Sequence, residues 1–139
     1  MMIGPHQEAP SEHWTDSLRD MFPIATTTGF SCFEGWKPII VRLLGRLSLL
    51  VEELPSDERR TFAVVEIRQK FGTLTVYLSG GPTPAMSEAI DAAREASTVT
   101  CEVCGAPGTL AERRGWTSVK CEAHENWSRF DPRPATPSS

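Results

Sequence analysis

Two pairs of metal-ligating residues in the last third of the chain constrain its fold more than any other feature. The four residues are Cys101, Cys104, Cys121 and His124, which read as Cys-x2-Cys, a gap of sixteen residues, and Cys-x2-His. Two close pairs separated by a loop are typical of a structural zinc site. Four protein ligands complete a tetrahedron and leave no position for water. We therefore predict a structural Zn²⁺ site whose binding energy helps to fold a small segment.

The segment between the two pairs predicts the local structure around the metal. Residues 109–111 and 116–120 could form a small hairpin with Gly115 at its turn, which would make a zinc ribbon or knuckle. Three thiolates, one neutral imidazole and Zn²⁺ sum to −1, and Arg113, Arg114 and Lys120 could offset that charge. The alternative is two buried pairs that hold no metal.

Composition limits the possible partners and the location. The chain has 139 residues, enough for one domain, and a net charge of −4. Residues 1–34 contain five acids and one base, and no segment is a basic arm, so nucleic acid is a minority hypothesis. The N-terminus, MMIGPHQEAP, has neither a cationic start nor an apolar stretch. We expect a cytoplasmic protein without membrane association, where paired cysteines favour metal over disulfides.

Apolar residues at helical spacing predict one long central helix. They step by three or four positions from Trp36 to Leu54, and Pro38 suits the first helical position. Pro55 should end this helix. Because Leu47 lies on the apolar stripe, we expect it in the core.

Shorter helices and loops flank this segment. One helix should begin near residue 11 and stop before Pro23, residues 25–35 should form a loop, and residues 86–97 should form a second helix. The predicted parts of the chain are a flexible N-terminus (1–10), an α+β part (11–100), a zinc-binding ribbon (101–130) and a disordered tail (131–139).

Residues 61–79 alternate in polarity with a period of two, which predicts a β-hairpin with Gly72 in its turn. Its expected apolar face consists of Ala63, Val65, Ile67, Leu74, Val76 and Leu78. That face should pack on the long helix, so Ile67 is a predicted core residue. The predicted fold class is α+β: helix–β-hairpin–helix followed by a small C-terminal zinc ribbon or knuckle.

Several motifs follow one another in a fixed order between residues 18 and 124. The most distinctive are KFG-x-L-x-x-Y at residues 70–77, CEVCGAPG at residues 101–108 and CEAH at residues 121–124. This pattern resembles a set of small uncharacterised proteins from phages, prophages and bacterial genomes. Members of that set usually carry Gly-Asp where this chain has Phe33-Glu34, and tend to have Arg in place of Thr75. The resemblance implies a metal-stabilised accessory protein and no particular reaction.

Candidate catalytic groups are few. Cys32 lies outside the metal motif and has no recognisable histidine partner, which is typical of a small buried hydrophobe. The adjacent acids at residues 52–53 and 57–58 resemble solvated surface more than carboxylates that converge in a pocket. An enzyme is therefore the least favoured of three functional hypotheses.

The best candidate contact surface is the polar face of the predicted hairpin, with Arg68, Lys70 and Tyr77. Arginine and tyrosine are enriched at binding hot spots, although such a face could equally be an ordinary solvent face. We expect a non-enzymatic binding module of the phage accessory type that acts by protein–protein contact. The acidic N-terminal part would favour a basic partner.

The second hypothesis is a nucleic-acid-binding zinc protein. In that case the residues that meet phosphates would be Arg113, Arg114, Lys120 and Arg129. The balance of five acids and five bases in residues 101–139 argues against this role.

Overall fold

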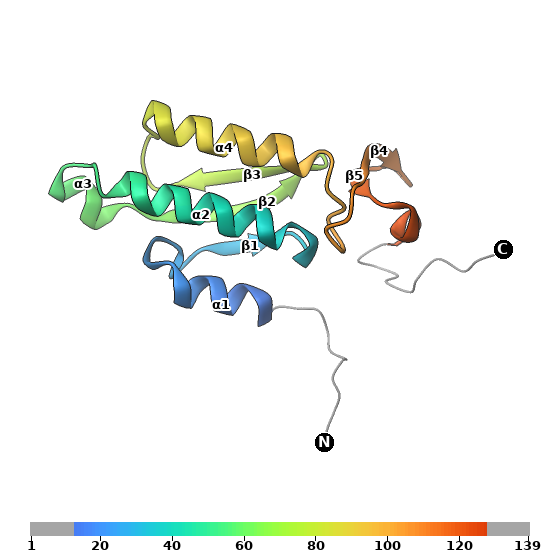
Figure 1. The fold of residues 1–139 in the computed structure, drawn as a ribbon, viewed down its shortest axis with the longest axis horizontal. Coiled ribbons are helices and arrows are strands. Elements are labelled where there is room, and N and C mark those ends of the chain that lie inside the picture. Colours follow the sequence, from blue (N-terminus) through green and yellow to red (C-terminus); the bar gives the residue numbers. More distant parts are fainter. Residues whose placement is uncertain (1–12, 128–139) are drawn as a thin grey trace, which may run out of the picture.

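The structure is a computed structural model that describes residues 13–127, so the predictions for residues 1–10 and 131–139 fall outside the described part. Four α-helices and two small β-sheets give these residues a mixed α+β fold, which confirms the predicted class (Figure 1). The helices are α1 (His13–Met21), α2 (Lys37–Val51), α3 (Ser56–Thr61) and α4 (Pro84–Ser97). The strands are β1 (Gly29–Ser31), β2 (Val64–Lys70), β3 (Thr73–Leu78), β4 (Thr109–Arg113) and β5 (Trp116–Lys120), and short 3-10 turns are η2 (Pro23–Ala25), η3 (Glu34–Trp36) and η4 (Glu122–His124).

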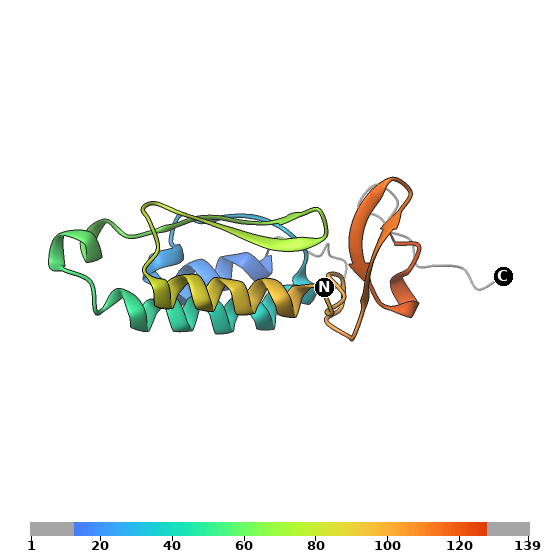
Figure 2. The same ribbon diagram turned by 90° about the horizontal axis from the view of Figure 1, so that it is seen from above.

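The larger sheet has the strand order β1-β2-β3, in which β1 is parallel and β3 antiparallel to β2. A two-residue loop joins β2 to β3, with φ of 54° at Phe71 and 83° at Gly72. Positive φ at both positions matches the right-handed twist of a hairpin, so the predicted turn at Gly72 is confirmed. Helices α1, α2 and α4 lie on one side of this sheet (Figure 2). The opposite face carries exposed side chains, among them Tyr77.

The core fills the space between the helices and the larger sheet. Trp36 and Leu47 from the α2 region, Ile67 from β2 and Leu74 from β3 are fully buried in one apolar cluster. The sequence-based assignment of Leu47 and Ile67 to the core is therefore confirmed. The length of α2 and its continuous apolar stripe make it the main support of the sheet.

Replacing Leu47 by alanine should strongly destabilise the protein. Its side chain is fully buried, and truncation of such a leucine costs about 2–5 kcal/mol of the free energy of unfolding. Leu49→Ala is the matched control because Leu49 lies on the same helix with 66% of its surface exposed. Urea unfolding should show a large shift of the midpoint for Leu47→Ala and almost none for Leu49→Ala. Equal stability of the two variants would contradict the orientation of α2.

The prediction of which β2 side chains face the core is wrong at the start of the strand. Val64 is fully buried and Val65 is 50% exposed, although simple alternation placed Val65 on the apolar face. The register against β3 shifts between Val64 and Glu66, which is a β-bulge. The extra residue of the bulge reverses which side chains point to the core, so the predicted alternation of buried and exposed residues holds only from Glu66 onwards.

Residues 25–35 are not simply a loop, as was predicted. Gly29–Ser31 pair in parallel with β2, and Glu34–Trp36 form a 3-10 turn that leads into α2. A three-residue strand is too short for a visible period, and its partner lies more than thirty residues away in the chain.

The end of α2 also differs from the prediction. The helix stops at Val51, and the next amides bond three residues back, with Leu54 N–H donating to the Val51 carbonyl at 3.0 Å. Leu54 therefore packs on the core from a tightened turn. The sequence did not predict α3 because none of its residues is buried, so it shows no apolar stripe.

Candidate metal centre

The segment after α4 returns on itself through a second hairpin, β4–β5, here called the C-terminal hairpin. Its two-residue turn has φ of 55° at Arg114 and 84° at Gly115, as expected for a tight hairpin turn. The prediction of a hairpin with Gly115 at its turn is confirmed. Strand β5 ends at Lys120, so Cys121 follows the sheet directly, and α4 ends four residues before Cys101.

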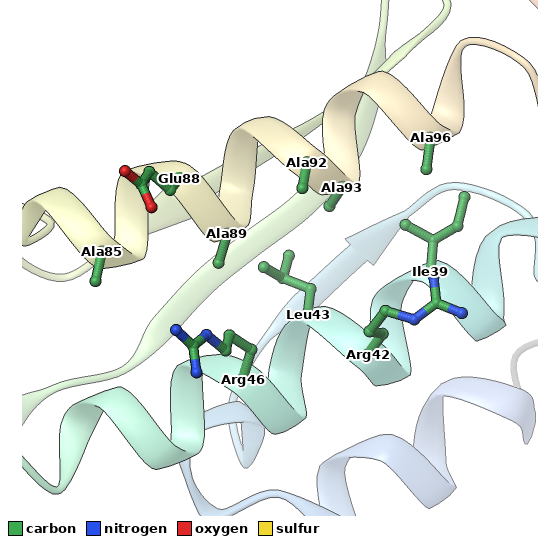
Figure 3. Close-up of a pocket in the computed structure, with 10 residues that line it drawn as sticks. All are labelled: Ile39, Arg42, Leu43, Arg46, Ala85, Glu88, Ala89, Ala92, Ala93 and Ala96. Carbon is green, nitrogen blue, oxygen red and sulfur yellow. The ribbon is translucent and has the colours of Figure 1, made fainter.

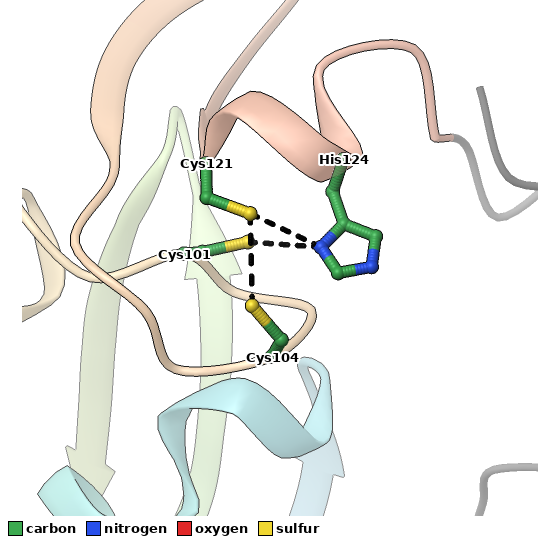
Figure 4. A group of neighbouring side chains, drawn as sticks. All are labelled: Cys101, Cys104, Cys121 and His124. Atoms are coloured by element: carbon green, nitrogen blue, oxygen red, sulfur yellow. Dashed lines mark hydrogen bonds between the residues drawn. The ribbon is translucent and has the colours of Figure 1, made fainter. Parts of the chain in front are cut away.

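The four predicted ligands come together in the structure (Figure 4). Their ligand atoms all lie within 4.8 Å of one another. Cys104 Sγ is 3.6 Å from Cys121 Sγ, and His124 Nδ1 is 3.2 Å from Cys121 Sγ and 3.8 Å from Cys101 Sγ. The cluster can therefore hold one metal ion.

These separations fit a tetrahedral centre. Metal–sulfur and metal–nitrogen bonds of about 2.3 and 2.05 Å at the tetrahedral angle place sulfurs roughly 3.8 Å apart and sulfur and nitrogen roughly 3.6 Å apart. The three distances given above, 3.2–3.8 Å, scatter around these values, and all the ligand atoms lie within 4.8 Å of one another. All described cysteines are free, and a disulfide would need sulfurs about 2.05 Å apart. The donor set of three sulfurs and one imidazole suits a thiophilic divalent ion.

Local turns hold each ligand pair in place. Gly105 follows Cys104 with φ of 86°, and its N–H donates to the Cys101 carbonyl at 2.9 Å, which folds the first pair into a tight loop. In the second pair His124 N–H donates to the Cys121 carbonyl at 3.1 Å within η4. Both turns bring the two ligand atoms of a pair close together, within 4.8 Å.

The first ligand loop is docked on the start of α2. Gly35 N–H donates to the Glu102 carbonyl at 2.9 Å, and the buried Trp36 indole N–H donates to the Thr100 carbonyl at 3.0 Å. A Cβ on Gly35 would lie 2.6 Å from the carbonyl carbon of Glu102, so only glycine allows this approach. The Gly35-Trp36 pair therefore connects the core to the metal centre.

A buried ion pair links the two ligand-bearing segments. Glu102 lies between the first two cysteines and Lys120 precedes Cys121; their side chains are 3.5 Å apart and almost inaccessible. Gln69 on β2 donates from its amide to Glu102 Oε1 at 3.2 Å and to the Thr117 carbonyl at 3.3 Å. The larger sheet thus supports both halves of the metal centre through one polar network.

Two of the three basic residues that were predicted to offset the charge of the metal site pair with carboxylates instead. Arg113 donates to both carboxylate oxygens of Glu125, at 2.8 and 3.3 Å, and to three backbone carbonyls of the C-terminal hairpin. This guanidinium holds the pKa of Glu125 below its usual range. Lys120 is occupied by Glu102. Of the three basic residues expected to offset the site, only Arg114 has no carboxylate partner within residues 13–127.

The pKa of Cys32, which lies outside the cluster, and that of Cys121, which lies inside it, shift in opposite directions. Burial, and to a lesser extent the charge of Glu102, raise the pKa of Cys32 to about 12, so this thiol stays protonated at neutral pH. Burial alone would raise the pKa of Cys121, but contacts with His124, Cys104 and Cys101 lower it to about 7. Cys121 is ready to lose its proton to a metal ion, whereas Cys32 lacks the character of a nucleophile.

The predicted contact residues lie in a row along the outer face of β2–β3. Arg68, Lys70 and Tyr77 are all exposed. Arg68 pairs with Thr75 and is diagonal to Tyr77. Lys70 follows two residues later on β2, about 7 Å from Arg68 and about 14 Å along the hairpin from the position of Tyr77. The three residues therefore share one face, with Arg68 between Tyr77 and Lys70.

A groove of about 350 Å³ lies between α2 and α4 (Figure 3). Its α4 side is lined mainly by alanines, with Glu88 beside them, and Arg42 and Arg46 extend from α2. The small side chains let the two helices approach closely, which is a sufficient reason for this composition.

Sequence reasoning missed the residues that support the metal centre. No supporting role was assigned to Gly35, Gln69 or Glu102, and Lys120 was considered only for its charge. A signal did exist for Glu102 and Lys120, because each is next to a predicted ligand. For Gly35 and Gln69 no local pattern indicates the role, since their contacts are more than thirty residues away.

Comparisons with protein-family models, with curated proteins and with solved structures gave no match. None of the helices within residues 13–127 is long and apolar enough to cross a membrane.

Proposed function

We propose that this protein is a non-enzymatic binding module stabilised by structural zinc. The observation that carries this proposal is the four-ligand centre formed by Cys101, Cys104, Cys121 and His124. Zinc suits three sulfurs and one imidazole at tetrahedral spacing, and four protein ligands leave no coordination position for a substrate. On this proposal the C-terminal hairpin with its ligand loops is a zinc ribbon, and the metal fixes its structure.

The network around the centre supports a structural role. The ion pair between Glu102 and Lys120, and the docking of Gly35 and Trp36, hold the ligands against the core. A catalytic centre would instead have three protein ligands and leave one coordination position for water or substrate.

The proposed contact surface for a partner protein is the open face of β2–β3 around Arg68 and Tyr77. Both side chains are exposed and lie diagonally across the two strands. Val65 beside the bulge and Phe71 at the turn add apolar surface, with 50% and 77% exposed. Aromatic, arginine and apolar side chains on one face are the composition of a protein-binding surface. This role fits the accessory protein that the sequence resemblance suggests.

A double variant tests the surface. Arg68→Ala with Tyr77→Ala should reduce partner recovery in an affinity pull-down at least tenfold, while zinc content and melting temperature stay unchanged. Arg60→Ala is the control because Arg60 is an exposed arginine on α3, outside the two strands that form this face. Wild-type recovery with the double variant, or equal loss with Arg60→Ala, would move the contact surface elsewhere.

The alternative, a nucleic-acid-binding zinc protein, has weaker support. Of its four proposed phosphate contacts, Lys120 is buried against Glu102 and Arg113 is bonded to Glu125. Arg129 lies outside the described residues. Arg114 alone is left, which is too little for generic phosphate binding along a duplex.

A further inference from the structure

A cavity of about 270 Å³ lies between the larger sheet and the C-terminal hairpin. The end of β1 and the residues after it, β2, β5 and the segment after η4 form its walls. Its floor includes the buried Glu102–Lys120 pair, so the cavity is built on a rigid polar network. Cavities at the junction of two substructures with a few convergent polar groups are the usual place for a small ligand.

Two tryptophans give the cavity an aromatic lining. Trp116 on β5 keeps 68% of its surface exposed, although it lines the cavity. Trp127 is held edge-on by Phe33, with ring centroids 4.8 Å apart, and Lys120 Nζ lies 6.0 Å from its ring. The exposed indole of Trp116 offers a face on which a planar ring can stack.

The cavity has more positive than negative charge. Its lining contains four cations and two carboxylates, namely Arg68, Arg113, Arg114, Lys120, Glu102 and Glu125. Two of the cations neutralise the two carboxylates, at 2.8 Å for Arg113–Glu125 and 3.5 Å for Lys120–Glu102.

The two remaining guanidiniums have little or no compensation. Among the residues that the structure describes, Arg68 has one carboxylate partner, Glu66, which is outside the lining and 3.9 Å away, close to the distance limit of an ion pair. Arg114 has no carboxylate partner among residues 13–127. These two guanidiniums match the charge of a phosphate monoester, to which each can donate two hydrogen bonds.

We propose that this cavity binds a nucleoside monophosphate. Trp116 provides the stacking surface for the base, and Arg68 and Arg114 provide the charge that attracts the phosphate. The volume is just below the roughly 300–1,000 Å³ of drug-sized ligand sites, which is the size range of one nucleotide unit. The nucleotide can be free or can be the terminal residue of a single strand. This inference does not depend on the proposed contact with a partner protein.

The test is a titration of the zinc-loaded full-length protein, followed by tryptophan fluorescence and by calorimetry. The probes are AMP, UMP, inorganic phosphate and a 5′-phosphorylated tetranucleotide. Both mononucleotides should bind saturably at millimolar or lower concentration, and inorganic phosphate should bind at least about tenfold more weakly because it cannot stack. If the tetranucleotide binds about tenfold more tightly than AMP, the ligand is a strand end; otherwise it is the free nucleotide.

Matched variants test separately the contribution of the Trp116 ring and that of the Arg114 charge to AMP binding. Arg114→Asn removes the guanidinium and tolerates the positive φ of this turn position, and Arg114→Lys keeps the charge. Trp116→Thr removes the ring from an exposed strand position, and Trp116→Phe keeps an aromatic ring. We expect Arg114→Asn and Trp116→Thr to weaken AMP binding at least about tenfold, and the conservative changes to weaken it less.

Measurements of zinc content and melting temperature check that each variant is folded. As the control for an arginine outside the cavity, Arg60→Ala should bind AMP like the wild type. No saturable binding of any mononucleotide by the wild-type protein would overturn the proposal. Equal affinity for inorganic phosphate and AMP, or unchanged affinity in Trp116→Thr, would also overturn it.

Discussion

Replacing Cys104 by serine should reduce the zinc content of the purified protein from about one ion per chain to nearly zero. A hydroxyl is a poor ligand for zinc, and loss of one corner opens the tetrahedron of sulfur and nitrogen atoms. Because metal binding by such sites supplies folding energy, residues from Cys101 onwards should lose protection in hydrogen exchange. Metal analysis of the purified protein and exchange mass spectrometry measure the two effects.

The rest of the chain should also become less stable in Cys104→Ser. Trp36 and Gln69 form hydrogen bonds with Thr100, Glu102 and Thr117, so unfolding of the metal segment removes partners from both the α2 region and β2. The melting temperature should fall by several degrees, since about 1 kcal/mol shifts it by about 2–8 °C for domains of this size range.

Cys32→Ala is the control for Cys104→Ser. Cys32 is not among the clustered ligands, so this variant should keep its full zinc content. Purified wild-type protein without metal, or zinc retained by Cys104→Ser, would show that the site is not the proposed structural centre.

Replacing Gly35 by alanine should disrupt the connection between the core and the metal centre. The added Cβ would lie 2.6 Å from the carbonyl carbon and oxygen of Glu102, and backbone atoms cannot rotate away as a flexible side chain can. Overpacking of this kind costs about 1–3 kcal/mol or more of the free energy of unfolding. To relieve this clash the two backbones must move apart, which should also weaken the hydrogen bond from Gly35 N–H to the Glu102 carbonyl. Thermal unfolding and a competition assay with a zinc chelator should show lower stability and faster loss of metal.

Gly45→Ala is the matched control because a Cβ at Gly45 would meet no atom within 4 Å. Gly45 lies inside α2, where alanine is favoured over glycine by about 0.5–1 kcal/mol, so this variant should be more stable than the wild type. If Gly35→Ala is as stable as Gly45→Ala and keeps its zinc, α2 does not rest on the ligand loop.

The features that the sequence predicted are those recorded in local spacing. The four ligands follow from two pairs of residues at fixed separations, since a short turn is enough to bring each pair to one metal. The apolar stripe of α2 places Leu47 in the core, and the alternation of β3 places Leu74 there, because both periods reflect the geometry of one element. The turns at Gly72 and Gly115 follow from the need for positive φ.

The features that required the tertiary structure depend on residues distant in the chain. The bulge at Val65 is set by the register against β3, and the three-residue strand β1 exists only because β2 offers it a partner. Gly35 is constrained by a backbone that lies 67 residues further on, and Gln69 by a carboxylate 33 residues away.

The sequence by itself determined the four clustered candidate ligands, the main elements and the α+β class of this protein. The tertiary structure decided how the metal centre is attached, through Gly35 and the Glu102–Lys120 pair, and which cations remain free beside it. Ligand spacing and periodicity are properties of short segments and can be read along the chain. Close backbone approach and charge pairing depend on which distant segments are in contact, and these tertiary contacts are fixed only when the whole core packs.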